Sequence, residues 1–320
     1  MATNESGIPE KQVLVITGPT ASGKSALALN IARTVDGEIV SADSRQIYRE
    51  ITIGSAKPSE EELCEIRHHF INEKSIGETF TAGEFASEAS ERIRAIQRRG
   101  KYAVVVGGST LYIEGLLKGF ADLPPGDPEI RRRLTAELDR YGSDKLYENL
   151  RKLDPDQAEK LDASKTHRLI RSLEIIAITG KTVTELQLNQ NIPFLKFRTI
   201  GLNMPRTRLY ERINMRVNSM IDAGLCKEAA YLYETYYCNN SSGDMSALNT
   251  VGYKELFHFF DGRTSFAAAV TLIKQHTRNY AKRQLTFFKN RLNVNWVDVP
   301  DDSAAMGALI AECCRALHEA

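Results

Sequence analysis

The residues with the clearest chemical signature form a glycine-rich segment near the N-terminus, GPTASGKS from Gly18 to Ser25. Its spacing is that of a P-loop, in which two glycines let the backbone curl so that successive N–H groups surround a phosphate. The Lys24 side chain adds a positive charge, and the Ser25 hydroxyl can bind Mg²⁺. The segment therefore predicts a site for a polyphosphate or diphosphate group.

A carboxylate that follows a second apolar segment is the next candidate for chemistry. Asp43 comes directly after residues 38–42 and could act as a general base or organise Mg²⁺. The alternative is a structural role as a helix cap or turn residue. A third apolar segment ends in GGST at 107–110, and not in the aspartate expected of a metal-binding Walker B strand. Asp43 is therefore the carboxylate expected nearest the phosphates.

Three short strands are expected to position these residues. Apolar segments at 13–17, 38–42 and 102–106 predict buried parallel strands. In a doubly wound sheet, ligands bind beyond the carboxyl ends of such strands. The P-loop, Asp43 and the GGST segment should therefore meet in one crevice. Helices are expected at 24–34, from a Ser59/Glu62 capping box toward His68, and from a Thr81/Glu84 capping box to Gly100.

The pattern changes after a proline-rich segment near residue 125. Residues 129–188 are charged and helical in pattern, whereas 197–202 indicate a strand that returns to the sheet. We therefore predict an α/β fold, with a P-loop NTPase-like parallel sheet flanked by helices and an inserted all-helical domain. The core is expected to comprise residues 1–122 and 196–320, and the insertion 123–195.

A basic segment near the C-terminus is the main charge feature, because the formal net charge of the chain is only +1. Six Lys or Arg residues and no acidic residue lie between Lys274 and Arg291. Lys274, Arg278 and Lys282 are spaced to share one helix face. This face is either a solvated surface or a contact for an anion or nucleic acid.

Several observations argue against a zinc site or a membrane location. The five cysteines form no C-x-x-C pair, and their odd number and irregular spacing suit reduced thiols. His68 and His69 are adjacent and are interpreted as structural. No apolar run is long enough to cross a bilayer, and the polar N-terminus does not resemble a signal peptide. We therefore expect a cytoplasmic protein without membrane contact.

A wider resemblance is carried by six segments between Gly18 and Arg291: GPTASGKS, SADSRQIYREITIGSAKP, GGSTLYIEGLLKG, HRLIRSLEIIAITGK, VGYKEL and TRNYAKRQLTFFKNR. These segments resemble those of tRNA dimethylallyltransferases, also called tRNA isopentenyltransferases, and occur in the expected order over nearly the whole chain. Thr52 and Ser109 stand where that family usually has Asp and Thr, and 164–166 is an atypical run. The chain resembles the bacterial type, because it has no C-terminal zinc finger.

The resemblance implies transfer of the dimethylallyl group of dimethylallyl diphosphate to N6 of adenosine 37 in tRNAs that read codons beginning with U. Diphosphate leaves, so the P-loop would hold a leaving group and would not take part in phosphoryl transfer. The implied catalytic residues are Asp43, as the base for the adenine amine, and Ser109. The implied cofactor is Mg²⁺ on Ser25. The implied diphosphate-binding residues are Gly18, Thr20, Ala21, Ser22, Gly23, Lys24, Ser25 and Arg283.

The resemblance also implies contacts with the anticodon stem-loop, from which the target adenine must be extruded. A monomer is expected from the family. Without the family resemblance, the arginines in 167–171 would be interpreted as part of a solvated helix face with no role in binding. The implied tRNA-binding residues are Asp43, Ser44, Arg45, Gln46, Ser109, Arg131, His167, Arg168, Arg171, Asn249, Gly252, Tyr253, Lys254, Arg278 and Lys282.

Three alternatives remain open from the sequence. An isopentenyltransferase acting on free adenine nucleotide would use the same P-loop and base. A small-molecule kinase would also use the P-loop, and a non-enzymatic RNA-binding module would leave the P-loop unexplained. The helical insertion and the basic C-terminal helix favour tRNA, because a mononucleotide needs neither.

Overall fold

The computed structural model describes residues 11–121, 123–188, 194–238 and 247–318. The chain divides into two compact units. The first comprises Met1–Leu117 and Phe194–Ala320, and the second is Lys118–Pro193.

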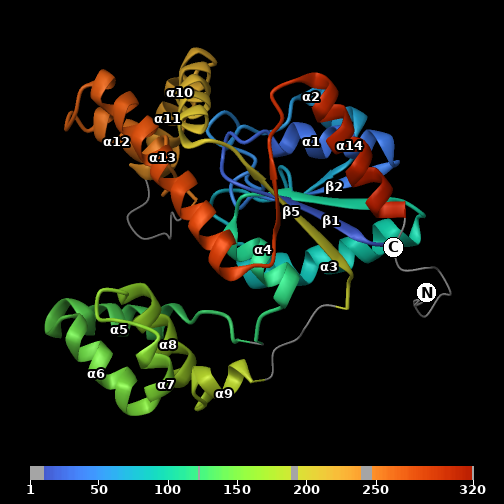
Figure 1. Cartoon of the computed structure of the whole chain (residues 1–320). Helices are drawn as coiled ribbons and strands as arrows, with labels where there is room; N and C mark the ends of the chain where they lie inside the picture. The colour runs from blue at the N-terminus through green and yellow to red at the C-terminus, as the bar shows by residue number, and fades with distance from the viewer. Residues whose placement is uncertain (1–10, 122, 189–193, 239–246, 319–320) are drawn as a thin grey trace. The chain divides into compact units, whose positions relative to one another are not determined.

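Within the described residues, the first unit contains one sheet of six parallel strands in the order β3-β2-β4-β1-β5-β6 (Figure 1). The predicted parallel α/β fold is therefore confirmed. The edge strands β3 and β6 were not predicted, because one is two residues long and the other has exposed ends. The strands are β1 (Val13–Thr17), β2 (Gly37–Ala42), β3 (His68–His69), β4 (Tyr102–Gly107), β5 (Phe197–Asn203) and β6 (Asn295–Asp298).

Helices cover both faces of the sheet, because successive residues of each central strand point to opposite sides. Val13 and Val15 face a core shared with α3, α4, α11 and α12, whereas Leu14 and Ile16 face one shared with α1 and α14. The helices of this unit are α1 (Lys24–Thr34), α2 (Glu60–Glu65), α3 (Ala82–Arg98), α4 (Thr110–Lys118), α10 (Arg206–Asp222), α11 (Leu225–Leu232), a π-helical turn (Tyr233–Tyr237), α12 (Tyr253–Phe260), α13 (Phe266–Arg291) and α14 (Ser303–His318).

Local signals place several of these helices. The capping boxes predicted at Ser59/Glu62 and Thr81/Glu84 are both present, and each satisfies backbone N–H groups that the first helical turn leaves free.

A glycine allows two strand ends to approach each other closely. A side chain at Gly107 would come within 2.0 Å of the Ala42 carbonyl oxygen, so glycine lets the ends of β4 and β2 meet.

The second unit is all-helical over the residues that the structure describes, and it has its own core. Leu134, Leu146, Leu150, Leu169 and Leu173 pack together inside it. Its helices are α5 (Pro128–Tyr141), α6 (Ser143–Leu153), α7 (Pro155–Glu159), α8 (Thr166–Thr179) and α9 (Val183–Gln187).

The adjacent histidines form the edge strand β3, which agrees with their interpretation as structural residues. His69 is buried, and its Nε2 atom lies 2.8 Å from Glu38 Oε2, to which Arg99 also donates. Across the described residues, no group of three or more His, Cys, Asp or Glu side chains could hold a metal ion. No helix in the described ranges is long and apolar enough to cross a membrane.

Candidate active site

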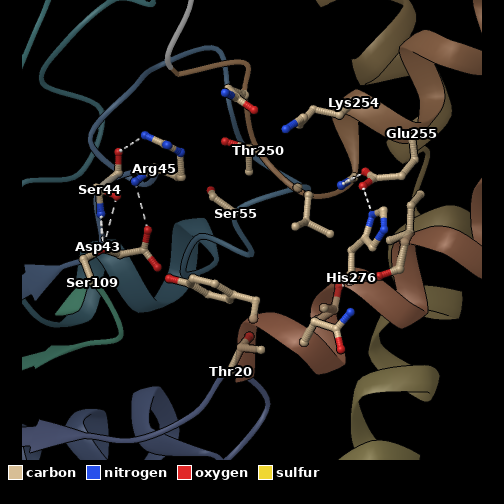
Figure 2. Close-up of a pocket in the computed structure, with 18 of the residues that line it drawn as sticks. Thr20, Asp43, Ser44, Arg45, Ser55, Ser109, Thr250, Lys254, Glu255 and His276 are labelled. Atoms are coloured by element: carbon tan, nitrogen blue, oxygen red, sulfur yellow. Dashed lines mark hydrogen bonds and ion pairs between the residues drawn. The ribbon is translucent and has the colours of Figure 1, made fainter. Parts of the chain in front are cut away.

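A cavity of about 720 Å³ lies beyond the carboxyl ends of the central strands (Figure 2). The P-loop contributes Thr20 to its wall, the end of β2 contributes Asp43, and the end of β4 contributes Ser109. The predicted meeting of these three segments in one crevice is thus observed. Helix α10 and the later, consecutive helices α12 and α13 also contribute to the wall.

The P-loop has the backbone that its glycines predict. Gly18 and Gly23 have positive φ angles of 142° and 93°, a region that favours glycine. The Lys24 Nζ atom donates to the Pro19 carbonyl oxygen at 3.1 Å. Burial and, to a smaller extent, the nearby Arg216 charge together lower the pKa of Lys24 to about 8, although Asp43 acts in the opposite direction. The loop is therefore an electropositive site whose lysine has a pKa of about 8.

Two smaller cavities flank the P-loop lysine. One, of about 70 Å³, is lined by Lys24, Ser25 and Asp43 among others. The second, of about 320 Å³, is lined by Ser25, Arg212 and Arg216 together with the first turn of α1. Arg212 is held in place because its Nε atom donates to the Ala21 carbonyl oxygen at 2.9 Å. Hydroxyl, carboxylate and cationic groups therefore surround the P-loop.

Asp43 and Ser109 are connected through Ser44, the first residue of the turn that follows β2. The Oδ1 atom of Asp43 accepts a hydrogen bond from the Arg45 backbone N–H at 2.9 Å. The Ser109 hydroxyl accepts from the Ser44 N–H at 2.8 Å and donates to the Ser44 hydroxyl at 3.2 Å. In this structure, Ser109 thus orders the Asp43 segment, a contact that the sequence did not predict.

The other residues predicted to contact RNA near the base occupy different environments. Arg45, Asn249 and Lys254 line the large cavity, as does the backbone at Gly252. The Gln46 side chain is engaged internally, because it accepts from the Ser41 hydroxyl and donates to the Ala56 carbonyl oxygen. Tyr253 is 0% exposed and donates to Glu228, so its side chain is not accessible to RNA. Its contribution is to core packing, which corrects the prediction for this residue.

The basic helix α13 presents its cations on different sides. Arg283 lines the large cavity. Arg278 is directed elsewhere: its Nη1 atom donates to Asn214 Oδ1 at 2.8 Å, and its guanidinium lies over the Tyr210 ring. Lys282 is exposed and is not among the residues of the cavity wall. Only one of the three cations predicted on this helix therefore faces the cavity.

The residues predicted in the inserted unit fall into two groups. His167 and Arg168 are exposed near the start of α8. Arg171 and Arg131 instead form ion pairs with buried Glu174, at 2.7 Å and 3.0 Å. Burial disfavours the Glu174 charge, but hydrogen bonds from the two arginines hold the pKa of that carboxyl below its ordinary value. These two arginines stabilise the unit itself.

Among the residues of the site that were not predicted are Arg216 and Gln284. Arg216 lies on α10 and lines all three cavities, one of them together with both Lys24 and Asp43. Burial lowers its pKa and Asp43 raises it. Gln284 on α13 is 2% exposed and contacts the P-loop. A single arginine in an amphipathic helix and a glutamine in a basic one carry no spacing signal, so sequence analysis could not find them.

The wall of the cavity near Gly54 is held by one carboxylate. Glu228 on α11 accepts hydrogen bonds from the backbone N–H groups of Thr52, Ile53 and Gly54, at 2.8 to 3.1 Å. It also accepts from the Tyr253 hydroxyl at 2.6 Å. Glu228 therefore fixes the loop that follows the Asp43 segment.

Removing this carboxylate should destabilise the protein. Glu228→Ala leaves three N–H groups and a buried hydroxyl without their acceptor, and we expect the free energy of unfolding to fall by about 2–4 kcal/mol. Urea denaturation measures the change, with Glu211→Ala on the exposed face of α10 as the control. Equal stability of the two variants would show that the loop does not depend on Glu228.

Comparisons with known proteins agree with the resemblance drawn from the six segments. The family model described as IPP transferase matches residues 46–291. A tRNA dimethylallyltransferase of Chlorobium limicola is 66% identical, over 98% of this chain and 99% of that protein. A protein of the same name from Pelodictyon phaeoclathratiforme is 62% identical, over 97% of this chain and 98% of its own.

Solved structures extend the comparison to the fold. The full-length tRNA isopentenylpyrophosphate transferase of Bacillus halodurans has a TM-score of 0.69 and 34% identity, covering 97% of this chain and 98% of that one. A eukaryotic dimethylallyltransferase described as acting on tRNA has a TM-score of 0.78 and 30% identity, covering 94% of this chain and 78% of that one. Sequence and fold together show that this chain belongs to the IPP transferase family.

Proposed function

We propose that the chain transfers a dimethylallyl group from dimethylallyl diphosphate to N6 of adenosine 37 in tRNAs that read codons beginning with U. The observation that carries the proposal is one cavity lined by both the P-loop after β1 and the aspartate at the end of β2. The names of relatives up to 66% identical over nearly the whole chain support the same reaction.

The diphosphate is assigned to the P-loop. Lys24, Arg216 and the loop N–H groups offer positive charge where the leaving diphosphate gains negative charge as the carbon–oxygen bond breaks. Arg283, on the wall of the large cavity, adds a further cation. The P-loop thus stabilises a leaving group and no phosphoryl group is transferred.

Mg²⁺ is proposed as the cofactor at this site. The residues fit it, because the Ser25 hydroxyl and the Asp43 carboxylate line the same small cavity, and Mg²⁺ prefers oxygen ligands of this kind. Ser25 would hold the ion next to the diphosphate. When bound, Mg²⁺ supplies additional charge stabilisation for the departing diphosphate.

Asp43 is proposed as the base for the adenine amine. The lone pair of this amine is delocalised into the ring, so the nitrogen is a weak nucleophile until its proton is removed. As N6 bonds to the first carbon of the prenyl group, a proton passes from N6 to Asp43 and diphosphate departs. The adenine must first leave its stack, at a cost of roughly a few kcal/mol.

Contacts with the anticodon stem-loop are proposed for polar residues of both units. In the first unit, Arg45, Asn249 and Lys254 line the cavity that the base would enter. In the inserted unit, His167 and Arg168 are exposed. A monomer is proposed as the active form from the family resemblance alone.

A comparison of acceptors tests the proposal. The protein is incubated with dimethylallyl diphosphate labelled in the prenyl group, Mg²⁺, and either unmodified tRNA or AMP. We expect label on tRNA alone, at an adenine 3′ to the anticodon. Label on AMP alone would support the free-nucleotide enzyme, and consumption of ATP without prenyl transfer would support a kinase.

A further inference from the structure

One buried side chain connects two of the three segments that form the proposed catalytic site. Gln284, on α13, accepts a hydrogen bond through Oε1 from the Thr20 backbone N–H of the P-loop, at 2.9 Å. Its Nε2 atom donates to the carbonyl oxygen of Gly108, at 2.8 Å. The side chain is 2% exposed, so both contacts are shielded from water. The ends of β1 and β4 are therefore joined by a single amide.

The connection continues from Gly108 to the third segment through the next residue. The Ser109 N–H donates to the Ala42 carbonyl oxygen at 3.1 Å, and the Ser109 hydroxyl accepts from the Ser44 N–H at 2.8 Å. Ala42 and Ser44 are the two neighbours of Asp43 in the chain. Short hydrogen bonds thus lead from the proposed diphosphate loop, through Gln284 and Ser109, to both sides of the proposed base.

The site fits a side chain that has the length of glutamine and ends in an amide. A Cβ atom at Gly108 would lie only 2.3 Å from Gln284 Nε2, so the glycine gives this side chain its space. Glutamine supplies one acceptor and one donor at its end, which match the Thr20 N–H and the Gly108 carbonyl oxygen. An ionised glutamate would lack the donor, and methionine would lack both groups.

We propose that Gln284 is a positioning residue for the transfer reaction, fixing the P-loop relative to Asp43 through Gly108 and Ser109. The inference rests on the proposed function for what these segments bind. A displacement of about 1 Å between reacting groups can lower a rate roughly a hundredfold. A buried glutamine that merely filled space would influence stability without this effect on the rate of the folded enzyme.

Kinetics of Gln284→Met test the proposal, with Gln275→Met on the exposed side of the same helix as the matched control. We expect kcat to fall about tenfold to a hundredfold for Gln284→Met, and the KM for dimethylallyl diphosphate to rise less than kcat falls. The control should keep wild-type values. The assays are run at temperatures well below the thermal unfolding of each variant, so that unfolded protein does not lower the measured kcat. A wild-type kcat for Gln284→Met would overturn the proposal.

The pH profile of Gln284→Glu provides a test within a single folded protein. A protonated glutamate can donate to Gly108 and still accept from Thr20, whereas the ionised form cannot donate. Its activity relative to wild type should therefore rise as the pH falls toward about 5, near the ordinary range of carboxyl groups. The same ratio for Gln275→Glu should stay flat. A flat ratio for Gln284→Glu would contradict the assignment.

These outcomes separate this inference from the proposed function. If the wild-type protein transfers no dimethylallyl group to tRNA, the proposed function fails before any variant is compared. If the wild type transfers it and both Gln284 variants match the wild type, the function stands and the positioning role is wrong.

Discussion

Replacing Asp43 by asparagine is expected to lower kcat by about 10²- to 10⁴-fold, the range for losing a general base. The amide cannot take up the proton that leaves the adenine nitrogen. Its oxygen can still accept from the Arg45 N–H, so the local backbone should be preserved. Single-turnover assays with saturating tRNA and dimethylallyl diphosphate measure the chemical step directly.

Binding measurements complete this test. Asp43→Asn should still bind inorganic diphosphate, because the P-loop cations are unchanged. Asp222→Asn, at the exposed end of α10, serves as the control and should keep wild-type turnover. If Asp43→Asn turns over at nearly the wild-type rate, the base has been assigned to the wrong residue.

Replacing Lys24 by methionine should lower kcat/KM for dimethylallyl diphosphate by about 10²- to 10³-fold, as expected when one preorganised charge-stabilising group is lost. The leaving diphosphate would then lose the cation buried in the P-loop. The exposed Lys227 on α11 provides the control, Lys227→Met, which should have little effect. Steady-state kinetics with varied dimethylallyl diphosphate measure the change.

The pH dependence of diphosphate binding gives an independent view of Lys24. Burial lowers the pKa of this lysine to about 8 in the free protein, so its charge is lost as the pH rises through that value. A bound diphosphate favours the charged form and raises the pKa again. Affinity should therefore weaken above pH 8, and binding at pH 8 should be accompanied by net proton uptake.

Calorimetry can detect this proton. Binding enthalpies of inorganic diphosphate, measured in buffers of different ionisation enthalpy, report the number of protons taken up. We expect the wild type to take up more protons than Lys24→Met, since titration of the ligand itself is common to both. Equal uptake by the two proteins would show that Lys24 stays charged in the free protein.

Sequence patterns were sufficient to predict the elements of the fold that depend on short, local stretches of residues. Four strands were predicted because their apolar, β-branched segments are long enough to be recognised, and a P-loop locates the first strand end. The edge strand His68–His69 is too short to show a period, and Asn295–Asp298 is exposed at its ends. The C-terminal helix Ser303–His318 was also not predicted, although it covers one face of the sheet.

The candidate site shows where prediction from sequence ends. The P-loop, Asp43 and Ser109 were predicted because each follows a recognisable strand. Arg216 and Gln284 enter from helices that pack over the sheet only after folding, so no local pattern marks them. Helical spacing correctly identified a basic helix but not which of its cations would face the cavity.

The central claim is that the P-loop holds diphosphate as a leaving group during transfer to tRNA. The most direct measurement follows both halves of dimethylallyl diphosphate at once, with the prenyl group and the phosphorus separately labelled and unmodified tRNA as acceptor. We predict one intact diphosphate released for each prenyl group found at N6 of adenosine. Phosphorus label on the tRNA, or release of diphosphate without prenyl transfer, would contradict the account.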